Sequence, residues 1–574
     1  MKRTGAELVV EALKAENVDI LFGFPGGVVL PLFDALYAEK SIRVVLTRHE
    51  QAAVHAADGY ARSTGRTGVC LVTSGPGATN TVTGLGTANF DSVPLVVLTG
   101  QVSRNMIGND AFQEADIVGI SRSVTKHNYL VSDRKDLGRI LREAFLIAST
   151  GRPGPVLVDL PKDVLQEASS EPLPQSVSIR GYNPVYKGHP MQIKKAAHVL
   201  AKAKKPLFYI GGGLVISNAS EIFRKVVEKS DVPVVTSLMG ISVLPSVHPR
   251  LLGMLGMHGT YAANTAVQNC DLLFAVGTRF DDRATGNLKK FAPSATVVHV
   301  DIDPASIARN VAVEVPIVGD ARLVLEELYT HIQPSPIKDW VTQTEDWKKT
   351  KPLVESPSNT HLSPTAIIKE LCRTFPDAIV TTEVGQNQMW TALYYDFKEP
   401  RTFLTSGGLG TMGYGFPAAI GAQLGNPGKR VIDIAGDGSI QMNIQELATA
   451  VTEGLPVIVA ILNNGYLGMV RQWQELFYGK RYSSTCLMRT GRCPRECSVP
   501  GEKCPPYVPD FVKLAQAYDA VGIRVEKQSE IEGALKEAAR VKDRPIFIDF
   551  IVEREANVWP MVPAGAGIDE MMNA

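Results

Sequence analysis

Short apolar runs, many of them rich in β-branched residues, recur along the chain and alternate with stretches that show helical spacing of apolar positions. The clearest runs are 43–47, 68–73, 94–99 and 155–159, then 206–210, 233–236, 272–276 and 296–301, and finally 378–382, 430–434, 457–462 and 545–551. Continuous apolar runs are typical of strands that are buried on both faces, as in parallel sheets covered by helices. The pattern predicts an α/β protein of three successive doubly wound parallel-sheet domains.

Two polar stretches separate the three sets of strands. Residues 169–190 are rich in Ser and Pro, and residues 333–363 are polar and interrupted by prolines. This composition is typical of linkers. We therefore expect an N-terminal domain at 1–168, a central domain at 190–332, a C-terminal domain at 364–555 and a C-terminal tail at 556–574.

Charge and composition narrow the function classes. The 574 residues include 59 Lys and Arg and 59 Asp and Glu, so the formal net charge is zero. Proteins that bind nucleic acid or anionic membranes in a general way carry a basic surface instead. No apolar run approaches the ~18 residues of a membrane span. We expect a protein that binds neither nucleic acid nor membrane.

The N-terminus and the scattered cysteines point to the cytoplasm. Glu7 and Glu11 interrupt the apolar positions near the N-terminus, which predicts an amphipathic helix and not a signal peptide. Cys70, Cys270 and Cys372 lie in apolar segments, so buried thiols are a better interpretation than a disulfide framework. A cytoplasmic location follows as an expectation.

The C-terminal domain carries a pair of polar motifs, each after a predicted strand. The run 430–434 leads into Gly436-Asp437-Gly438-Ser439, and the next run leads into Asn463-Asn464. An Asp carboxylate and an Asn amide oxygen are hard donors of the kind that Mg²⁺ prefers, and Mg²⁺ often shares its ligand sphere with phosphates. Glycines let the backbone approach a diphosphate closely. The motifs predict a magnesium and diphosphate site at the carboxyl edge of the sheet.

This pairing of motifs resembles that of the thiamine-diphosphate enzymes. The resemblance implies that Asp437, Asn464 and the backbone carbonyl of Tyr466 are the protein ligands of Mg²⁺. It also implies an isolated glutamate in another domain, here Glu50 in Arg48-His49-Glu50-Gln51. In that family the glutamate hydrogen-bonds the aminopyrimidine ring and so assists removal of the cofactor's C2 proton.

The resemblance narrows to the catalytic subunits of acetohydroxyacid synthases, also called acetolactate synthases, and covers about residues 4–566. The segments that carry it are FGFPGG (22–27), RHEQAA (48–53), TSGPGATN (73–80), DAFQE (110–114), GRPGP (151–155), PKD (161–163), MLGMHGT (254–260), RFDDR (279–283), GGLGTMG (407–413) and MVRQWQ (469–474). It implies decarboxylation of pyruvate and ligation of the resulting two-carbon unit to pyruvate or 2-oxobutanoate, in valine, leucine and isoleucine biosynthesis. It further implies the cofactors thiamine diphosphate, Mg²⁺ and FAD, a homodimer or homotetramer in which Glu50 of one subunit meets Asp437 of the other, and a small regulatory subunit.

Residue roles follow from the same resemblance. Met412 would bend the cofactor, Trp473 would pack on the second 2-oxo acid, and the active-site pocket and channel would be lined by Gly27, Gln113, Lys162 and Arg283. Further positions that match thiamine-diphosphate contacts are Val384, Gly385, Gln386, Asn387, Gly410, Gly438, Ser439, Leu467, Gly468 and Met469. Positions that match FAD contacts are Arg152, Gly211, Gly212, Thr236, Leu238, Met257, His258, Gly277, Arg279, Asp281, Asp301, Ile302, Gly319 and Asp320.

The sequence departs from the family pattern at two places. The usual Asp-Val-Gly-Gln-His-Gln is here Glu383-Val384-Gly385-Gln386-Asn387-Gln388, and Ser103 stands where many relatives carry proline. The histidine of relatives reaches the diphosphate. Asn387 can still donate a hydrogen bond but carries no positive charge, so we expect slightly weaker cofactor binding.

An insert of four cysteines, Cys486, Cys493, Cys497 and Cys504, does not belong to the general family pattern. The segment is poor in apolar residues and rich in Pro, Gly and Arg, so it needs a staple to become ordered. Four thiols suit Zn²⁺ or an iron–sulfur cluster, although the spacing is not CxxC…CxxC. Two disulfides or four thiols on a mobile loop are the alternatives. The position shortly after Trp473 places the insert near the active site.

Other functions remain to be separated from carboligation. Pyruvate oxidase and glyoxylate carboligase are related enzymes, but the latter lacks the glutamate found here as Glu50, and the QWQ context of Trp473 disfavours the former. A flavin- or nucleotide-binding protein without catalytic activity is an alternative of another class. The joint presence of Glu50, Asp437 and Asn464 argues against it.

Overall fold

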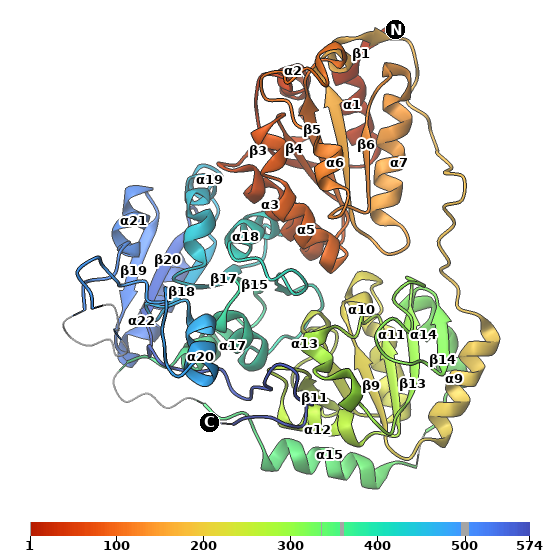
Figure 1. Cartoon of the computed structure of the whole chain (residues 1–574), viewed down its shortest axis with the longest axis vertical. Coiled ribbons are helices and arrows are strands. Elements are labelled where there is room, and N and C mark those ends of the chain that lie inside the picture. The colour runs from red at the N-terminus through yellow and green to blue at the C-terminus, as the bar shows by residue number, and fades with distance from the viewer. Residues whose placement is uncertain (1, 335, 356–360, 495–496, 498–503, 574) are drawn as a thin grey trace.

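The computed structural model describes residues 2–334, 336–355, 361–494, 497 and 504–573, and three six-stranded parallel sheets organise them (Figure 1). Each sheet belongs to one third of the chain and has helices on both faces. The predicted α/β class with three successive doubly wound parallel-sheet domains is confirmed. In Figure 1 the N-terminal domain (red to orange), the central domain (yellow to green) and the C-terminal domain (cyan to blue) form the corners of a triangle.

The N-terminal sheet has the strand order β3-β2-β4-β5-β7-β6. Its strands are β2 (Ile20–Phe24), β3 (Arg43–Leu46), β4 (Gly68–Val72), β5 (Leu95–Gln101), β6 (His127–Leu130) and β7 (Pro155–Pro161). Its helices are α1 (Gly5–Ala15), α2 (Leu30–Ala38), α3 (Glu50–Thr64), α4 (Pro76–Thr79), α5 (Val82–Asp91), α6 (Ile117–Ser121), α7 (Leu137–Ser149) and α8 (Lys162–Gln166). The short strands β1 (Arg3–Thr4) and β8 (Ala168–Ser169) pair antiparallel and close the domain.

The central sheet has the order β11-β10-β9-β12-β13-β14. Its strands are β9 (Pro206–Ile210), β10 (Val234–Thr236), β11 (Leu251–Met254), β12 (Leu272–Val276), β13 (Thr296–Asp301) and β14 (Val315–Val318). Its helices are α9 (Pro190–Lys202), α10 (Gly212–Ile216), α11 (Ser220–Ser230), α12 (Tyr261–Asn269), α13 (Asp282–Thr285) and α14 (Ala321–His331).

The C-terminal sheet has the order β16-β15-β17-β18-β20-β19. Its strands are β15 (Ile379–Thr382), β16 (Phe403–Leu404), β17 (Val431–Gly436), β18 (Ile458–Asn463), β19 (Val521–Val525) and β20 (Ile546–Ile551). Its helices are α16 (Pro364–Thr374), α17 (Gln386–Tyr394), α18 (Gly415–Gly425), α19 (Leu447–Thr452), α20 (Gly468–Phe477), α21 (Phe511–Ala517) and α22 (Gln528–Arg540). No helix in the described ranges combines the length and apolar character that crossing a membrane requires.

The two predicted linkers differ in structure. The first linker has no regular secondary structure between β8 and α9, and it runs along the outside of the molecule to α9 (Figure 1). The second, whose residues 335 and 356–360 lie outside the described residues, contains the helix α15 (Lys338–Thr350). Trp340 of α15 is buried in the central core and donates from its indole nitrogen to the Pro206 carbonyl at 2.9 Å. The buried Trp340 therefore attaches this stretch to the central domain, although the polarity of the stretch as a whole predicted a linker.

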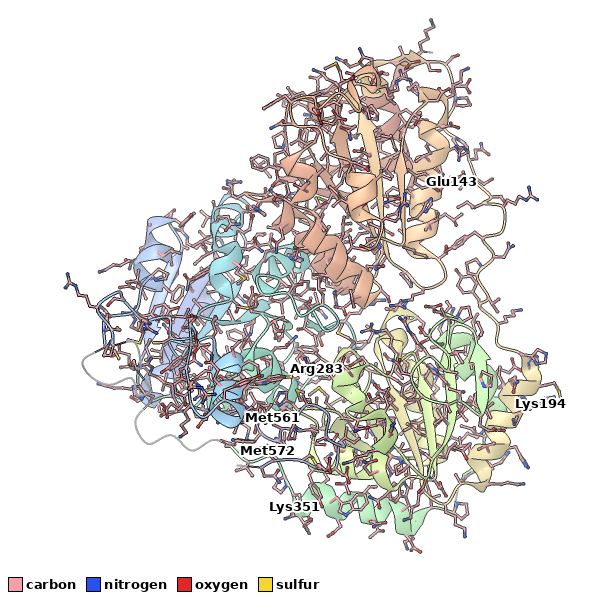
Figure 2. All side chains as sticks on the ribbon, viewed as in Figure 1. Glu143, Lys194, Arg283, Lys351, Met561 and Met572 are labelled. Atoms are coloured by element: carbon pink, nitrogen blue, oxygen red, sulfur yellow. The ribbon has the colours of Figure 1, made fainter. Side chains whose placement is uncertain are left out.

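The C-terminal tail returns from the C-terminal domain to the central one. The Val562 amide donates to the Met257 carbonyl at 2.8 Å, and Ile568 is buried in the central core. Met561 and Met572 form an antiparallel bridge, and Figure 2 shows both where these two domains meet. The tail thus fastens the central domain beside residues matched to flavin contacts.

Helices α3 and α18 join the N- and C-terminal domains through two glycines. A Cβ placed on Gly59 of α3 would lie 2.1 Å from the Ala418 carbonyl oxygen, and one on Gly421 of α18 would lie 1.8 Å from the Ala56 oxygen. Contacts this short between a carbon and a backbone oxygen do not occur, so the two helices approach each other only because both positions lack a side chain.

Gly421→Ala should destabilise the protein by at least about 2 kcal/mol, because the added methyl group has no space and the helix backbones must move apart. Chemical denaturation would measure the shift of the unfolding midpoint. Gly533→Ala in α22 is the matched control. A Cβ there meets nothing within 4 Å, and alanine in a helix interior is favoured by up to about 1 kcal/mol. Equal midpoints for the two variants would contradict the packing argument.

Candidate functional site

The polar motifs of the C-terminal domain come together because their strands are neighbours. Strands β15, β17 and β18 are adjacent and parallel, so the residues that follow them lie at one edge of the sheet. They are Glu383 to Gln386 after β15, Asp437 to Ser439 after β17, and Asn464 to Tyr466 after β18. The expected juxtaposition of Asp437 with Asn464 is present in one chain.

Asp437 and Asn464 are buried and are held by hydrogen bonds. The Asp437 carboxylate accepts a hydrogen bond from the Gly465 amide at 3.0 Å, and its carbonyl accepts one from the Tyr507 hydroxyl at 3.3 Å. The Asn464 side-chain oxygen accepts the Tyr466 amide at 3.0 Å. Burial raises the pKa of Asp437 to about 7. A buried carboxylate is stabilised by a cation, so this donor set fits a divalent ion with oxygen ligands.

The same three loops line one small cavity of about 60 Å³. Every lining residue belongs to the C-terminal domain: Val384, Gly385, Gln386, Asn387, Trp390, Met412, Gly436, Asp437, Gly438, Ser439, Leu462, Asn464, Tyr466, Leu467, Gly468, Met469 and Val470. A Cβ on Gly468 would lie 2.2 Å from the Gln386 side-chain oxygen. Glycine therefore keeps this surface open for a group that must approach the backbone, which fits a diphosphate.

Asn387 does not direct its donors into the cavity. Its amide nitrogen donates to the Glu383 carbonyl at 2.9 Å and to the Ile434 carbonyl at 2.7 Å. Both partners are pure acceptors, so they determine which end of the amide carries the nitrogen. The side-chain oxygen faces Gly385 and Gly436 instead. The backbone thus uses both N–H groups of Asn387 in this structure, and its hydrogen bond to a diphosphate stays a prediction.

The first residues of the four-cysteine insert pair with the loop that follows β18. The Leu467 amide donates to the Thr485 carbonyl and the Leu487 amide to the Gly465 carbonyl, both at 2.9 Å, so Cys486 forms an antiparallel bridge with Tyr466. The predicted position near the active site agrees with this contact.

The described residues of the insert form no metal or cluster site, which was one of the alternatives for the four thiols. Residues 495–496 and 498–503 lie outside the described residues, but all four cysteines are described. Within the described ranges no three His, Cys, Asp or Glu side chains gather to hold a metal. Cys486 lies 4.0 Å from the Arg554 guanidinium, whereas Cys493 is bonded within its own turn to Thr490. Cys486 and Cys493 thus each have a separate local contact.

The N-terminal domain contributes a second set of residues at the carboxyl edge of its sheet. Gly27 follows β2, Glu50 follows β3 and opens α3, and Lys162 follows β7 and opens α8. The Glu50 carboxylate accepts a hydrogen bond from the Asn80 amide at 3.0 Å. The backbone of Gln113, which has a φ of 57°, packs against Gly75 in the turn after β4.

These two sets do not meet in one chain. Glu50, Gly27, Gln113 and Lys162 are not among the residues that line the small cavity with Asp437. The described chain therefore has two separate groups of candidate residues, each at the carboxyl edge of a different sheet.

Two larger cavities of about 610 and 910 Å³ lie beside the central domain and share Phe90, Arg279, Asp281 and Asp282 in their walls. Residues matched to FAD contacts line them: Gly212, Leu238, Met257, His258, Gly277, Arg279 and Asp281 in the first, and Arg152, Arg279, Asp281 and Ile302 in the second. Gly211, Thr236, Asp301, Gly319 and Asp320 line neither cavity but stand at the ends of β9, β10, β13 and β14.

The shape and charge of this double cavity fit an elongated dinucleotide. A Cβ on Gly211 would lie 2.3 Å from the Gly277 carbonyl oxygen, so the loops after β9 and β12 touch backbone to backbone beside the 610 Å³ cavity, which Gly277 lines. Arg152 bridges the domains by pairing with Asp303 at 3.1 Å. Burial raises the pKa of the neighbouring Asp301 to about 6 and lowers that of His258 to about 4, so the His258 ring is neutral near pH 7.

Met412 lies between the small cavity and the 610 Å³ cavity and lines both. Trp473 and Arg283 line the larger one, and the Arg283 guanidinium sits 5.6 Å from the centre of the Trp473 ring. Figure 2 shows Arg283 where the central and C-terminal domains face each other. An apolar ring beside a cation is suited to a small anionic substrate with an alkyl group.

The sequence analysis did not identify three residues that support the candidate site. Tyr507 holds the Asp437 carbonyl, Arg554 donates to the Asn464 carbonyl at 3.2 Å, and Asp91 accepts the amides of Gly407 and Gly408. Each lies far along the chain from the motif it supports, so no local spacing could have identified it.

Comparison with known proteins places the whole chain. Family models of the thiamine pyrophosphate enzymes match in three parts: the N-terminal TPP binding domain at residues 3–120, the central domain at 193–328 and the C-terminal TPP binding domain at 383–550. The acetolactate synthase isozyme 3 large subunit of Escherichia coli is 50% identical over 580 residues, with 99% of this chain and 98% of the relative covered. An acetolactate synthase of Mycobacterium bovis is 50% identical (100% and 91%), and the acetolactate synthase large subunit of Haemophilus influenzae is 47% identical (100% and 98%). The chain therefore belongs to the thiamine pyrophosphate enzymes, among the acetolactate synthase large subunits.

Proposed function

We propose that this chain is the catalytic subunit of an acetolactate synthase that forms 2-acetolactate or 2-aceto-2-hydroxybutanoate from two 2-oxo acids. The observation that carries the proposal is the buried Asp437–Asn464 pair in a glycine-lined cavity whose wall includes Met412. Thiamine diphosphate, when bound, supplies the nucleophilic carbon that takes up the first 2-oxo acid and releases its carboxylate as CO₂. The protein's part is to hold, bend and protonate the reacting groups.

Asp437, Asn464 and the Tyr466 carbonyl would hold Mg²⁺, and the loops after β15 and β17 would receive the diphosphate. The Asp437 carboxylate lies in the interior, where an oxygen-ligated cation compensates its charge. Met412 would press against the middle of the cofactor from the side of the larger cavity. A bent cofactor would bring its own acid–base groups close to its reactive carbon, and Met412 would support that bend.

Glu50 would act across a subunit interface. It stands at the N-terminus of α3, oriented by Asn80, at the same sheet edge as Gly27 and Lys162. Since it does not line the cavity of its own chain, a second copy must supply the Asp437 half-site to complete it. In that position Glu50 would hydrogen-bond the pyrimidine ring and set its tautomer, and Gln113 and Lys162 would receive substrate oxygens. The chain is therefore proposed to function as a homodimer or a dimer of dimers.

The double cavity would hold FAD, and Trp473 with Arg283 would receive the acceptor 2-oxo acid. The Arg283 guanidinium would attract the carboxylate, while the Trp473 ring would pack on the alkyl group, where one additional methylene contributes roughly 0.8 kcal/mol. The ligation is redox-neutral, so the flavin would have no electron to transfer in it.

The proposal also includes a small regulatory subunit as partner and the cytoplasm as location. Several relatives are named large subunits, which supports a small regulatory subunit for this chain as well. The buried Cys70 and Cys270 form no disulfide, in keeping with a reducing cytoplasm.

Incubation of the purified chain with pyruvate, Mg²⁺, thiamine diphosphate and FAD tests the function. We expect acetolactate and CO₂ without oxygen consumption. Oxygen uptake with acetate or acetyl phosphate as product would indicate an oxidase instead, and flavin binding without pyruvate turnover would indicate a protein that only binds nucleotides.

Glu50→Gln and Asp437→Ala should fail in different ways. Glu50→Gln removes the ionisable group but leaves the diphosphate cradle intact, so activity should fall by at least about a hundredfold while Mg²⁺-dependent cofactor binding persists. Asp437→Ala removes a metal ligand and should abolish that binding. Tryptophan fluorescence quenching measures binding, and acetolactate formation measures activity. A Glu50→Gln protein with near wild-type turnover would remove this mechanism.

Mixing these two variants tests the shared site. When both chains are co-expressed equally, half of the dimers are mixed, and each contains one site with both residues intact. Activity should therefore return to about a quarter of the wild-type value. If Glu50 and Asp437 acted within one chain, the mixture would be no more active than the two separate variants together.

Asn387→His should tighten thiamine-diphosphate binding by about threefold to tenfold, because a ring N–H would face the diphosphate in place of the present amide oxygen. Asn387→Asp, which adds a negative charge at the same place, should weaken binding. Isothermal titration with the cofactor and Mg²⁺ compares the two variants with wild type, and equal affinities for all three would contradict the described orientation.

A further inference from the structure

The segment that contains Met412 has little conformational preference of its own. It comprises residues 406–416, here called the wedge loop, with the sequence SGGLGTMGYGF and five glycines. Glycine has the largest backbone freedom of any residue, so a glycine-rich loop is ordered only by what holds it. Met412 itself is half-buried and lies between two cavities, so its position depends on those attachments.

The first attachment comes from the N-terminal domain. The Asp91 carboxylate, at the end of α5, accepts the Gly407 amide at 3.0 Å and the Gly408 amide at 2.8 Å. Its side chain is 1% exposed and pairs with Arg62 at 3.0 Å. Arg62 is in turn held by Asp58 of the same helix, α3. Asp91 is thus a fully partnered buried carboxylate, which is the condition under which such a group is stable.

The second attachment comes from the C-terminal domain. The buried Glu383 carboxylate accepts the Gly413 amide at 2.6 Å and the Phe416 amide at 3.2 Å. The Asn443 side-chain amide donates a second hydrogen bond to Gly413, at its carbonyl oxygen, with a distance of 2.6 Å. The residue directly after Met412 is therefore fixed through both its N–H and its C=O group.

Gly413 could not be held in this way if it were another residue. Its φ is 87°, in the left-handed region, and a Cβ would lie 2.8 Å from the Met442 Cβ. Glu383 is one of the positions at which this chain departs from its relatives, and it is longer by one methylene group than the usual aspartate. That length lets a side chain rooted after β15 reach the start of α18.

We propose that Asp91 and Glu383 are positioning residues that clamp the wedge loop from two domains and thereby fix Met412. The clamp is a property of the chain itself. Its effect on catalysis rests on the proposed function, because only a bound cofactor is bent by Met412. Neither carboxylate lines the small cavity, so neither would touch the diphosphate.

Hydrogen exchange of the protein without cofactor tests the clamp directly. In Glu383→Gln one acceptor oxygen becomes an amide nitrogen, so amides at 411–416 should exchange about tenfold faster. In Asp91→Asn the same change should appear at 406–410. Amides at 418–425 within α18 should be unchanged in both variants. Unchanged exchange in the wedge loop, or equal acceleration throughout the C-terminal domain, would overturn the proposal.

The loaded enzyme tests the consequence. In both variants kcat for acetolactate formation should fall about tenfold, while the KM for pyruvate and the affinity for thiamine diphosphate stay within about threefold. The exchange of the cofactor's C2 proton with deuterium should slow in parallel, because the bend determines how close the two rings lie. Loosened exchange in the loop with normal kcat and normal C2 exchange would refute the positioning role.

Glu143→Gln is the matched control. This carboxylate is also nearly buried and accepts hydrogen bonds from Tyr129 and Arg139, but it lies on α7, away from the C-terminal domain (Figure 2). It should leave wedge-loop exchange and kcat unchanged. If wild type forms no acetolactate, the proposed function fails, whereas the exchange experiment without cofactor still decides whether the clamp exists.

Discussion

The close approach of α3 and α18 is the contact on which the rest of the molecule depends. Gly59 and Gly421 bring the two helix backbones together, so the N- and C-terminal domains are joined at one fixed angle. Helix α3 carries Glu50 at its first residue and Arg62 in its last turn, and the first two residues of α18 are the last two of the wedge loop. One helix pair thus sets both where Glu50 points and what holds the loop that carries Met412.

The same contact explains why the candidate active site is divided. With the helices locked, the carboxyl edges of the N- and C-terminal sheets present separate surfaces, and the cavity around Asp437 is lined by the C-terminal domain only. In the proposed function a second copy of the chain would bring Glu50 to the cofactor. The central domain is attached differently, through Arg152 paired with Asp303 and through the returning tail at Met257, and both attachments border the double cavity.

Three of the departures from the expected family pattern lie beside one cavity. Glu383 clamps the wedge loop, Asn387 turns its donors toward the backbone, and the cysteine insert starts as a bridge to Tyr466. All three touch the loops that would receive a diphosphate. The longer side chain of Glu383 and the direction of the Asn387 N–H groups change the surroundings of the proposed diphosphate site. The proposed metal ligands Asp437 and Asn464 stay the same.

The sequence by itself determined the fold class and the positions of the chemical groups, because continuous apolar runs mark buried parallel strands and the motifs follow those strands directly. It predicted interior strands such as β4, β12 and β18 and the edge strand β3. It overlooked the interior strand β2 and five edge strands, β6, β11, β14, β16 and β19. An edge strand is covered less completely, so its apolar run is shorter. Only the tertiary structure decided the rest: that Asn387 turns toward carbonyls, that Cys486 forms a bridge with Tyr466, and that Asp91 and Glu383 both bind the wedge loop. Those facts depend on contacts between residues up to hundreds of positions apart, and no local spacing encodes them.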